Sequence, residues 1–473
     1  MVFSSITFLS IFLPVVFLLN LVIRNIKVRN GILMVASLVF YAYGEPAYVL
    51  LMILNALWNY LLARGIAKGK GAKGFLVLAV CLNIGTLILF KYTGMLVRTF
   101  DALTGLAVPV PQIRLPIGIS FFTFQALSYV IDVYRGETEV QKNYFRLLLY
   151  ISFFPQLIAG PIVKYRDISD QITKRDMTLD KVAQGLRRFV CGLAKKVLIA
   201  NTMGRVADLI FAGGLQELSV VTAWLGAMAY LFQIYYDFSG YSDMAIGLGR
   251  MFGFTFKENF NYPYTAGSIQ DFWRRWHISL STWFKEYLYI PMGGNRKGAA
   301  RTDLNKIFVF LMTGLWHGAN WTFVLWGLWH GLFLLLEAHV PMLRKLPKGI
   351  NKLYTLLVVV LGFVMFRADT ISYGIGYIGR MFTFTTVSRV SISLALEQLT
   401  PWFIGILAAA VIGCGPICKL SGSIKEHVLN GPLVQTKWKV VDLALYFLAF
   451  LGLVFCMFRL SSGAYNPFIY FRF

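Results

Sequence analysis

Long apolar stretches separated by short polar connections run along the whole chain. They lie at about 5–23, 31–43, 47–64, 74–92, 115–133, 145–162, 184–212, 219–238, 306–322, 323–339, 351–366, 401–420 and 439–459. A helix needs about 20 residues to cross the hydrocarbon core of a bilayer. Several of the stretches are shorter than that, so we expect about ten to twelve full crossings together with short or re-entrant helices.

The composition supports a membrane protein. Hydrophobic residues make up 57% of the 473 residues and charged residues only 14%, whereas a soluble protein carries about 25% charged residues. Backbone polar groups in lipid must be satisfied internally, which leaves helices or a closed β-barrel. A barrel would need alternating strands of about ten residues, and the stretches here are longer and continuous. The sequence therefore predicts an all-α polytopic fold, and without a long linker or clear repeat we expect one domain over residues 1–473.

The net charge of +23 first suggests a nucleic-acid-binding protein. The basic residues, however, lie in short connections between apolar stretches, where Lys and Arg mark the cytoplasmic side of a membrane. We therefore expect no nucleic-acid partner and place the basic stretches 164–196 and 274–306 in the cytoplasm. The basic residues of segment 24–29 follow the first apolar stretch, whereas those of a signal peptide precede its core. Residues 5–23 are thus predicted as a transmembrane helix with the N-terminus outside the cytoplasm.

The cysteines show no pattern of a metal site or a disulfide framework. Cys414 and Cys418 have the i,i+4 spacing of one helix face, but no Cys or His pair nearby completes a metal site. We interpret all five cysteines as small packing residues and expect no bound metal.

His317 is the first candidate for catalysis, because it lies in a stretch without charge from Phe308 to Leu336. An ionisable residue at membrane depth is costly and indicates function. Imidazole titrates near neutrality, so it can accept and return a proton. A neutral histidine that forms hydrogen bonds between helices is an equally good interpretation from chemistry alone.

The other four histidines have simpler interpretations. His277 lies in a segment where aromatic and basic residues alternate, Asp271–Leu280, which is typical of an anchor at the membrane interface. His330 is predicted to pack between helices. His339 and His427 lie near predicted helix ends, where contact with solvent or lipid head groups explains them.

A polar run at 235–244 contains Asp237, Ser239 and Asp243 and is predicted to end one apolar span and open another. These side chains could line a substrate tunnel or orient a histidine. The favoured alternative is structural: Ser239 would cap the start of a helix whose positive end attracts Asp243.

Another polar position precedes a predicted helix break. Gln156 comes directly before Leu157–Pro161, whose glycine and proline must interrupt a helix. The break is typical of a re-entrant segment that lines a cavity, and a plain turn between helices is equally possible. Upstream, Asp132 is spaced to pair with Arg135.

Together these segments resemble the membrane-bound O-acyltransferase family, and within it the membrane subunits of bacterial alginate O-acetylation. The resemblance runs from the first residue to the last and is weakest over about 380–440. The matching words are MVFSS (1–5), PIGISF (116–121), YVIDVYRG (129–136), LIAGP (157–161), DFSGYSDMAIGLG (237–249), ENFN (258–261), FWRRWHISLS (272–281), GGNRK (293–297), GLWHGAN (314–320), FRA (366–368) and NPFIYFRF (466–473).

The resemblance implies a ring of helices around a thin centre, where two opposed funnels meet near a histidine. His317 matches the family's catalytic histidine, and His277 matches its second characteristic histidine. As a general base toward an acceptor hydroxyl, His317 would contribute about 10²–10⁴-fold in rate. Asn320, beside Trp316 and His317, is a candidate hydrogen-bond donor to the thioester carbonyl, and Trp316 is a candidate for lining the tunnel.

The resemblance also suggests a binding surface for the acyl donor. Arg274 and Arg275 lie in the basic segment 274–301, which could attract the phosphates of an acyl-carrying pantetheine group. A role in setting topology explains the same charges equally well.

The function implied is transfer of acetyl from a cytoplasmic thioester, acetyl-coenzyme A or another, toward an extracytoplasmic polysaccharide such as alginate or a cell-wall glycan. A separate SGNH-like extracytoplasmic acetyltransferase would complete the transfer, in a bacterial inner membrane and without a tightly bound cofactor. Two alternatives stay open. One is D-alanyl transfer to teichoic acid from a carrier protein, because that branch shares the Phe-Trp-x-Arg-Trp-His word. The other is a transporter with a histidine proton relay.

Overall fold

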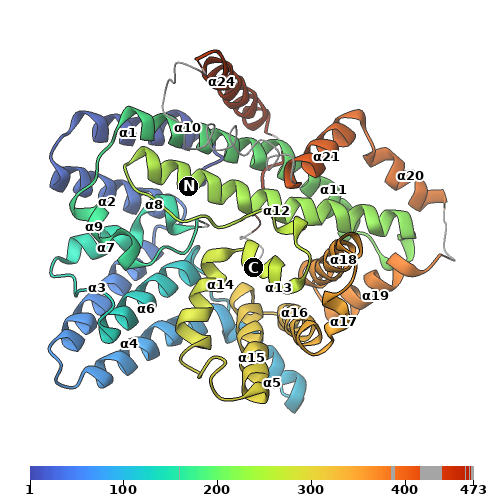
Figure 1. The fold of residues 1–473 in the computed structure, drawn as a ribbon, viewed down its shortest axis with the longest axis horizontal. Helices are drawn as coiled ribbons and strands as arrows, with labels where there is room; N and C mark the ends of the chain where they lie inside the picture. The colour runs from blue at the N-terminus through green and yellow to red at the C-terminus, as the bar shows by residue number, and fades with distance from the viewer. Residues whose placement is uncertain (159, 385–388, 416–438, 464, 468, 470–473) are drawn as a thin grey trace. The chain divides into compact units, whose positions relative to one another are not determined.

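The computed structural model describes residues 1–473 apart from 159, 385–388, 416–438, 464, 468 and 470–473, and every regular element in the described part is a helix (Figure 1). This confirms the predicted all-α fold class. The α-helices are α1 Leu13–Val22, α2 Ile26–Ala42, α3 Tyr48–Ala67, α4 Ala72–Leu87, α5 Thr93–Thr104, α6 Ile119–Arg135, α7 Tyr144–Ser152, α8 Phe154–Leu157, α9 Tyr165–Thr173, α10 Leu179–Ala194, α11 Asn201–Phe211, α12 Val220–Met251, α13 Ile269–Arg275, α14 Ile278–Phe284, α15 Ala299–His317, α16 Trp321–His339, α17 Pro341–Arg344, α18 Lys348–Arg367, α19 Ile371–Phe382, α20 Arg389–Gln398, α21 Pro401–Cys414 and α24 Lys439–Ser461.

Contacts divide the chain into two compact units, each assembled from segments far apart in the sequence. The first unit comprises Met1–Cys191, Tyr241–Glu258 and Val428–Phe450. The second comprises Gly192–Gly240, Asn259–His427 and Leu451–Phe473. The expectation of a single domain over the whole chain, with two funnels around a thin centre, stays a prediction.

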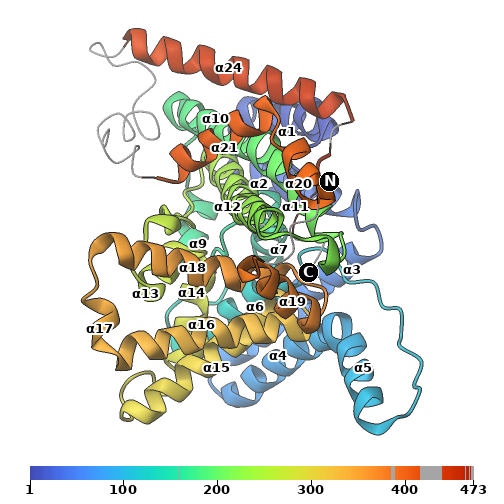
Figure 2. The ribbon, with the colours of Figure 1, turned by 90° about the vertical axis from the view of Figure 1, so that its right-hand side faces the viewer.

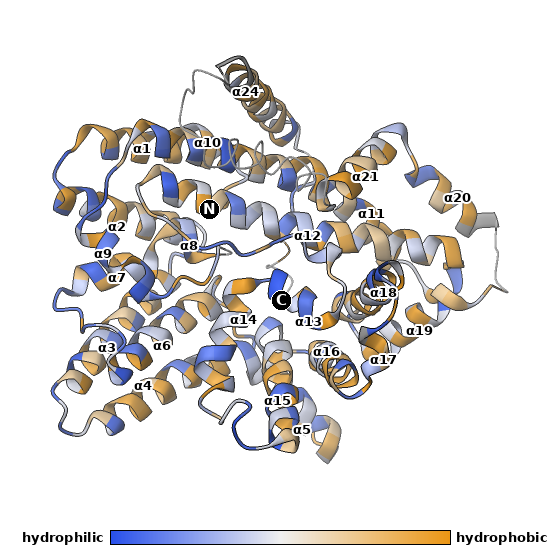
Figure 3. Ribbon diagram, viewed as in Figure 1, coloured by the Kyte–Doolittle hydropathy of each residue, from blue (hydrophilic) through white to orange (hydrophobic). Residues whose placement is uncertain are grey.

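Within the described residues, five helices are long and apolar enough to cross a membrane: Tyr48–Ala67, Ala72–Thr104, Trp321–His339, Lys348–Arg367 and Leu443–Ser461. Figure 3 shows hydrophobic residues along most of α24, which contains the last of them. A sixth span is possible where Ile392–Gln398 and Pro401–Cys414 form a pair bent by 75°. Other apolar stretches form shorter helices, such as Phe8–Val22. The structure thus supports a multi-pass protein, and the ten to twelve crossings stay a prediction.

The interior of the first unit holds polar side chains between apolar helices. Three fully buried asparagines join α3 to α4: Asn55 Nδ2 donates to Asn83 Oδ1 at 2.9 Å, and Asn83 Nδ2 donates to Asn59 Oδ1 at 2.8 Å. Because lipid offers no competing water, such bonds between helices hold a membrane bundle together.

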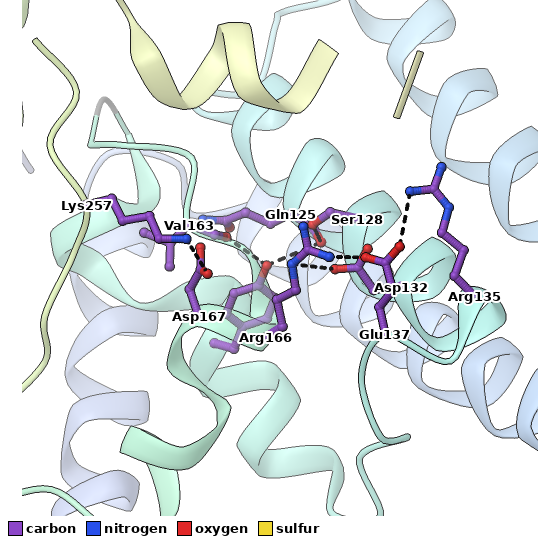
Figure 4. A network of polar contacts seen from close by, with 10 residues as sticks. Gln125, Ser128, Asp132, Arg135, Glu137, Val163, Arg166, Asp167 and Lys257 are labelled. Atoms are coloured by element: carbon purple, nitrogen blue, oxygen red, sulfur yellow. Dashed lines mark hydrogen bonds and ion pairs between the residues drawn. The ribbon is translucent and has the colours of Figure 1, made fainter. Parts of the chain in front are cut away.

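A second polar network of this unit surrounds the C-terminal end of α6 (Figure 4). The fully buried Asp132 lies 3.7 Å from the guanidinium of Arg166, which also contacts Glu137. Arg135 lies 3.8 Å from Glu137. A buried carboxylate needs a charge partner, and Arg166 of α9 provides one. The pairing of Asp132 with Arg135 that the spacing suggested stays a prediction.

The predicted helix break near Gln156 is present. Helix α7 ends at Ser152, and the short α8, Phe154–Leu157, ends at Leu157, where the predicted break begins. The buried amide of Gln156 donates to the carbonyl oxygen of Tyr150, so it helps to satisfy the interrupted backbone.

The predicted helix start at Ser239 is wrong. Helix α12 runs without interruption from Val220 to Met251, straight through the polar run. The acidic residues of the run have charge partners: Asp237 lies 2.8 Å from Lys196, and Asp243 lies 2.8 Å from Arg188. Because these charges are paired at the helix surface, the helix continues where the polar pattern suggested an end.

In the second unit, α15 and α16 run side by side (Figures 1 and 2). A Cβ atom on Gly314 would lie 2.3 Å from the carbonyl oxygen of Phe323, and one on Gly327 would lie 2.3 Å from that of Phe310. Glycine therefore permits an approach of the two backbones that no other residue allows. This close pair carries His317 at its turn.

Candidate active site

His317 is the last residue of α15 and is buried among aromatic rings. Its imidazole lies edge-on to Trp316, Trp326 and Phe366, with ring centroids 5.0, 5.1 and 5.2 Å away. The helix ends here because Gly318 takes up an extended backbone and Asn320 caps the next helix. The sequence thus brings an ionisable group to a helix end inside an apolar shell.

A small cavity of about 10 Å³, roughly the space that one water molecule needs, lies beside His317. Among the described residues that line it, His317 alone is ionisable, so they offer one acid–base group in apolar surroundings. The lining residues are Ile234, Phe238, Trp276, His317, Trp326, Phe363, Phe366 and Ile469.

His277 also contacts Trp316, whose indole centroid is 5.8 Å from its imidazole. The ring of Phe238, which also lines the cavity, lies 4.5 Å from it. His277 joins α13 to α14 with φ 44° and ψ 54°, a left-handed conformation. This conformation costs about 1–2 kcal/mol for a residue with a Cβ atom. Strain held by surrounding structure is a mark of functional sites.

Asn259 fixes the tautomer of His277. Its Oδ1 accepts hydrogen bonds from the backbone N–H and the hydroxyl of Ser279, at 3.1 and 2.9 Å. Because this oxygen is an acceptor, the contact with His277 Nδ1 at 3.3 Å requires Nδ1 to donate. Burial lowers the pKa of His277 to about 3, so the ring is neutral. Nε2 is left with a buried lone pair and no hydrogen-bond partner within the described residues.

Glu337 positions the helix that precedes His277, and sequence reasoning missed it. From α16, its carboxylate accepts hydrogen bonds from the backbone N–H groups of Ile269 and Gln270, at 2.6 and 3.2 Å. Ser268 caps the same end of α13 through the N–H of Asp271. A carboxylate at a helix N-terminus is favourable because of the helix dipole. The sequence signal that could have identified Glu337 is that it is a lone acidic residue after an apolar run.

His330 extends the row of rings. Trp326 lies 5.1 Å from both His317 and His330, and the ring of Trp273 lies 5.2 Å from His330. His330 is fully buried and contacts α18 closely, since a Cβ on Gly362 would lie 3.0 Å from its Nε2. This is the packing position that the sequence predicted.

Other predicted site residues of the second unit lie outside the cavity lining. Asn320 caps α16 by accepting from the Thr322 N–H, and its amide donates to the Asp369 carbonyl at 2.9 Å. Ser239 is buried on α12. Arg274 is exposed, and Arg275 pairs with Asp271 at 2.9 Å. Their proposed tunnel and donor-binding roles stay predictions.

Asp237 is connected to the cavity indirectly. Its carboxylate accepts a hydrogen bond from the backbone N–H of Ile469 at 3.0 Å, and Ile469 lines the cavity. Sequence reasoning selected Asp237 but had no means of finding the C-terminal residue that it holds.

Two predicted residues belong to the first unit. Gln156 lies in the short α8, and Asp243 accepts from Arg188, which also contacts Glu258. These two carboxylates raise the pKa of Arg188 although its burial opposes them. The cluster is an ion-pair network within this unit, and the tunnel roles of Gln156 and Asp243 stay predictions.

Two histidines remain, His339 and His427. His339 ends α16 with a half-exposed ring that lies 2.5 Å from the carboxylate of Asp303, as the prediction of a solvent-facing helix end requires. His427 and Cys418 lie outside the described residues.

Fold and site together define a helical, multi-pass membrane protein with a histidine at a buried apolar cavity. The model of the membrane-bound O-acyltransferase family matches residues 141–359. A probable alginate O-acetylase of Pseudomonas putida is 40% identical, and the match covers 100% of both chains. The chain belongs to the membrane-bound O-acyltransferase family and is an O-acyltransferase.

Two further groups of relatives differ in coverage. A peptidoglycan O-acetyltransferase of Helicobacter pylori is 37% identical over 83% of this chain and 82% of its own length. A teichoic acid D-alanyltransferase of Bacillus subtilis is 29% identical over 43% of this chain and 53% of its own. The match to the peptidoglycan O-acetyltransferase thus covers nearly twice as much of this chain as the match to the teichoic acid D-alanyltransferase.

Proposed function

We propose that this protein passes an acetyl group from a cytoplasmic acyl thioester, such as acetyl-coenzyme A, toward an extracytoplasmic polysaccharide. The observation that carries the proposal is His317, the one ionisable side chain among the described residues that line a small apolar cavity. The names and coverage of the relatives favour acetyl over D-alanyl. Alginate-like exopolysaccharides and cell-wall glycans are the acceptor classes that these names suggest.

In the proposed reaction, His317 acts as general base toward the acceptor hydroxyl. The hydroxyl oxygen attacks the thioester carbonyl, its proton moves to the imidazole, and the C–S bond breaks. The proton then passes from His317 to the thiolate that leaves, so that an ester and a thiol are the products. The apolar lining strengthens electrostatic interactions in the cavity because it excludes water.

His277 takes a supporting part in this proposal. Its neutral ring donates from Nδ1 to Asn259 and leaves a lone pair on Nε2. That lone pair suits acceptance of a hydrogen bond from an amide or hydroxyl of a substrate, and it holds no proton with which to stabilise an oxyanion. We infer that His277 orients a substrate while His317 moves the proton.

The proposal places the chain in a bacterial inner membrane with its N-terminus outside and its basic connections in the cytoplasm. A separate SGNH-like acetyltransferase would deliver acetyl to the polysaccharide. A reporter that is active only outside the cytoplasm, fused to the N-terminus, tests the orientation. An inactive fusion on an inserted, functional protein contradicts it.

The decisive experiment compares two histidine variants in cells that lack the native copy. We expect His317→Ala to lower the acetyl ester content of the polysaccharide, measured by NMR, by at least about 100-fold. His339→Ala is the control, because this half-exposed histidine lies outside the cavity, and it should remain within about twofold of the wild type. Wild-type acetylation by correctly inserted His317→Ala would overturn the proposal. If the protein were instead a transporter in which His317 relays protons, His317→Ala would leave acyl transfer itself unaffected.

A further inference from the structure

The C-terminal segment supplies part of the wall of the histidine cavity. Ile469 is almost fully buried and lines the cavity together with Ile234, Phe238 and His317. The described residues between the end of α24 at Ser461 and Ile469 form no long helix, so the position of Ile469 depends on what binds the backbone around it.

A buried ion pair holds that backbone. Lys196 Nζ lies 2.8 Å from Asp237 Oδ1, and each side chain is only 2% exposed. Both partners also bind the C-terminal segment: Asp237 Oδ2 accepts from the Ile469 N–H at 3.0 Å, and Lys196 Nζ donates to the carbonyl of Pro467. A buried ion pair is stable only when hydrogen bonds satisfy its remaining polar atoms, and here the C-terminal backbone provides them.

Further polar contacts fix the residues just before Ile469. Asn201 donates to the side chain of Asn466 at 3.1 Å. The hydroxyl of Tyr465 donates to Asp208, whose other oxygen lies 3.0 Å from Arg367. The segment is therefore attached at several successive residues.

Helix α12 supplies both Asp237, which binds the backbone of Ile469, and two other residues of the cavity wall. Ile234 and Phe238 on α12 line the cavity, and Asp237 lies between them in the sequence. A change at Asp237 would therefore move Ile469 relative to side chains that stay on the same helix.

We propose that Ile469 is a specificity-determining residue that restricts the transferred acyl group to acetyl, and that Lys196 and Asp237 are the positioning residues that hold it. This inference rests on the proposed function, because it assumes that the cavity beside His317 receives the acyl chain. Each additional methylene of the acyl group must fit against the Ile469 side chain. One methylene in an apolar pocket changes discrimination by about 10–200-fold.

The test measures acyl selectivity with full-length protein in native membranes. Acetyl-, propionyl- and butyryl-coenzyme A are supplied separately, and esters on the polysaccharide are quantified by mass spectrometry. Ile469→Ala should raise the ratio of propionyl to acetyl transfer at least about 10-fold. Ile469→Val should shift it in the same direction by a smaller factor, which keeps the test decisive if the alanine variant fails to fold. Ile404→Ala, on an exposed face of α21, should leave the ratio unchanged.

A second measurement separates positioning from general stability. Asp237→Asn keeps an oxygen for the Ile469 N–H but removes the charge that faces Lys196. It should raise the propionyl-to-acetyl ratio in the wild-type background and leave it unchanged in the Ile469→Ala background, because its effect passes through Ile469. A purely structural role would lower both transfer rates in proportion and leave the ratio constant.

The outcomes distinguish this inference from the proposed function. Acetyl transfer that depends on His317, with a ratio that stays within twofold in both Ile469 variants, refutes the inference alone. Acetylation that is indifferent to His317 refutes the proposed function and the inference with it.

Discussion

The indole of Trp316 contacts two histidines, with its centroid 5.8 Å from the ring of His277 and 5.0 Å from that of His317. These two imidazoles, which the sequence separates by forty positions, therefore share one rigid neighbour. A change in Trp316 should affect the position of both rings.

We expect Trp316→Leu to lower acetyl transfer about 100-fold, because a displacement of about 1 Å in a catalytic group has an effect of that size. Trp316→Phe should recover part of the activity, since it retains an aromatic face of similar orientation. The acetyl ester content of the polysaccharide, measured at equal abundance of each protein in the membrane, checks both predictions. Equal activity of the leucine variant and the wild type would show that the indole does not orient the histidines.

Removal of the Asn259 side chain should both destabilise the protein and lower its activity. Asn259→Ala leaves the N–H of Ser279 and Nδ1 of His277 without their buried acceptor. Each unsatisfied buried group costs about 1–3 kcal/mol. Asn259→Asp retains an acceptor oxygen and should be milder. Denaturation of the purified protein in detergent measures the difference, and equal stability of the two variants would contradict this account.

Glu337 should matter for activity although it is not one of the residues that line the cavity. Glu337→Ala removes the acceptor for two N–H groups at the start of α13, which should lower the free energy of unfolding by about 1–3 kcal/mol. Glu337→Gln keeps one acceptor oxygen and should lose less. The expected order of acetyl transfer is wild type, glutamine, alanine. An alanine variant as active as the wild type would show that α13 needs no such cap.

Stability should fall in mild acid because of His277. Its neighbours are the rings of Phe238, Phe260 and Trp316 and the amide of Asn259. None of these is charged, and burial lowers its pKa to about 3. The unfolded chain takes up a proton at this histidine below about pH 6.5, and the folded chain does so only near pH 3.

The contribution of His277 to the free energy of unfolding is therefore complete above about pH 6.5, and it is lost as the pH falls toward 3. The loss approaches about 1.4 kcal/mol per pH unit, or about 2 kcal/mol between pH 6.5 and 5. We expect the unfolding free energy of the wild type to decline more steeply over that range than that of His277→Gln. Parallel curves for the two proteins would contradict the buried neutral state.

Contact between α15 and α16 should depend on glycine. Gly314→Ala would place a Cβ atom 2.3 Å from a carbonyl oxygen of the facing helix, so the helices must separate and the turn that carries His317 must shift. We expect a loss of about 1–3 kcal/mol in stability together with lower transfer. Gly349→Ala is the matched control, because nothing lies within 4 Å of its added Cβ. It should be neutral or slightly stabilising, and an equal effect of both variants would refute the close-packing explanation.

Local patterns were enough to predict the helical class and several local features. Continuous apolar stretches predicted helices, and the break near Gln156 followed from Pro161 and Gly160. Family words then selected His277 and His317. Each of these signals lies within a few neighbouring residues, which is why it can be read without tertiary structure.

The error at Ser239 shows where local reading fails. A run of polar residues suggested a helix end, but Lys196 and Arg188 neutralise its carboxylates from elsewhere in the chain. These partners are separated in the sequence from the carboxylates that they neutralise by about 40 and 55 residues, so the local pattern could not reveal them.

By itself, the sequence determined that this chain is a helical membrane protein with a histidine in an apolar setting, because hydrophobicity and helix-breaking residues act over short distances. Only the tertiary structure decided what surrounds that histidine. It placed Trp316 in contact with both imidazoles, gave His277 its tautomer through Asn259, and brought Ile469 to the cavity wall through Asp237. Those relationships arise from contacts between distant segments, and such contacts depend on how the whole chain packs.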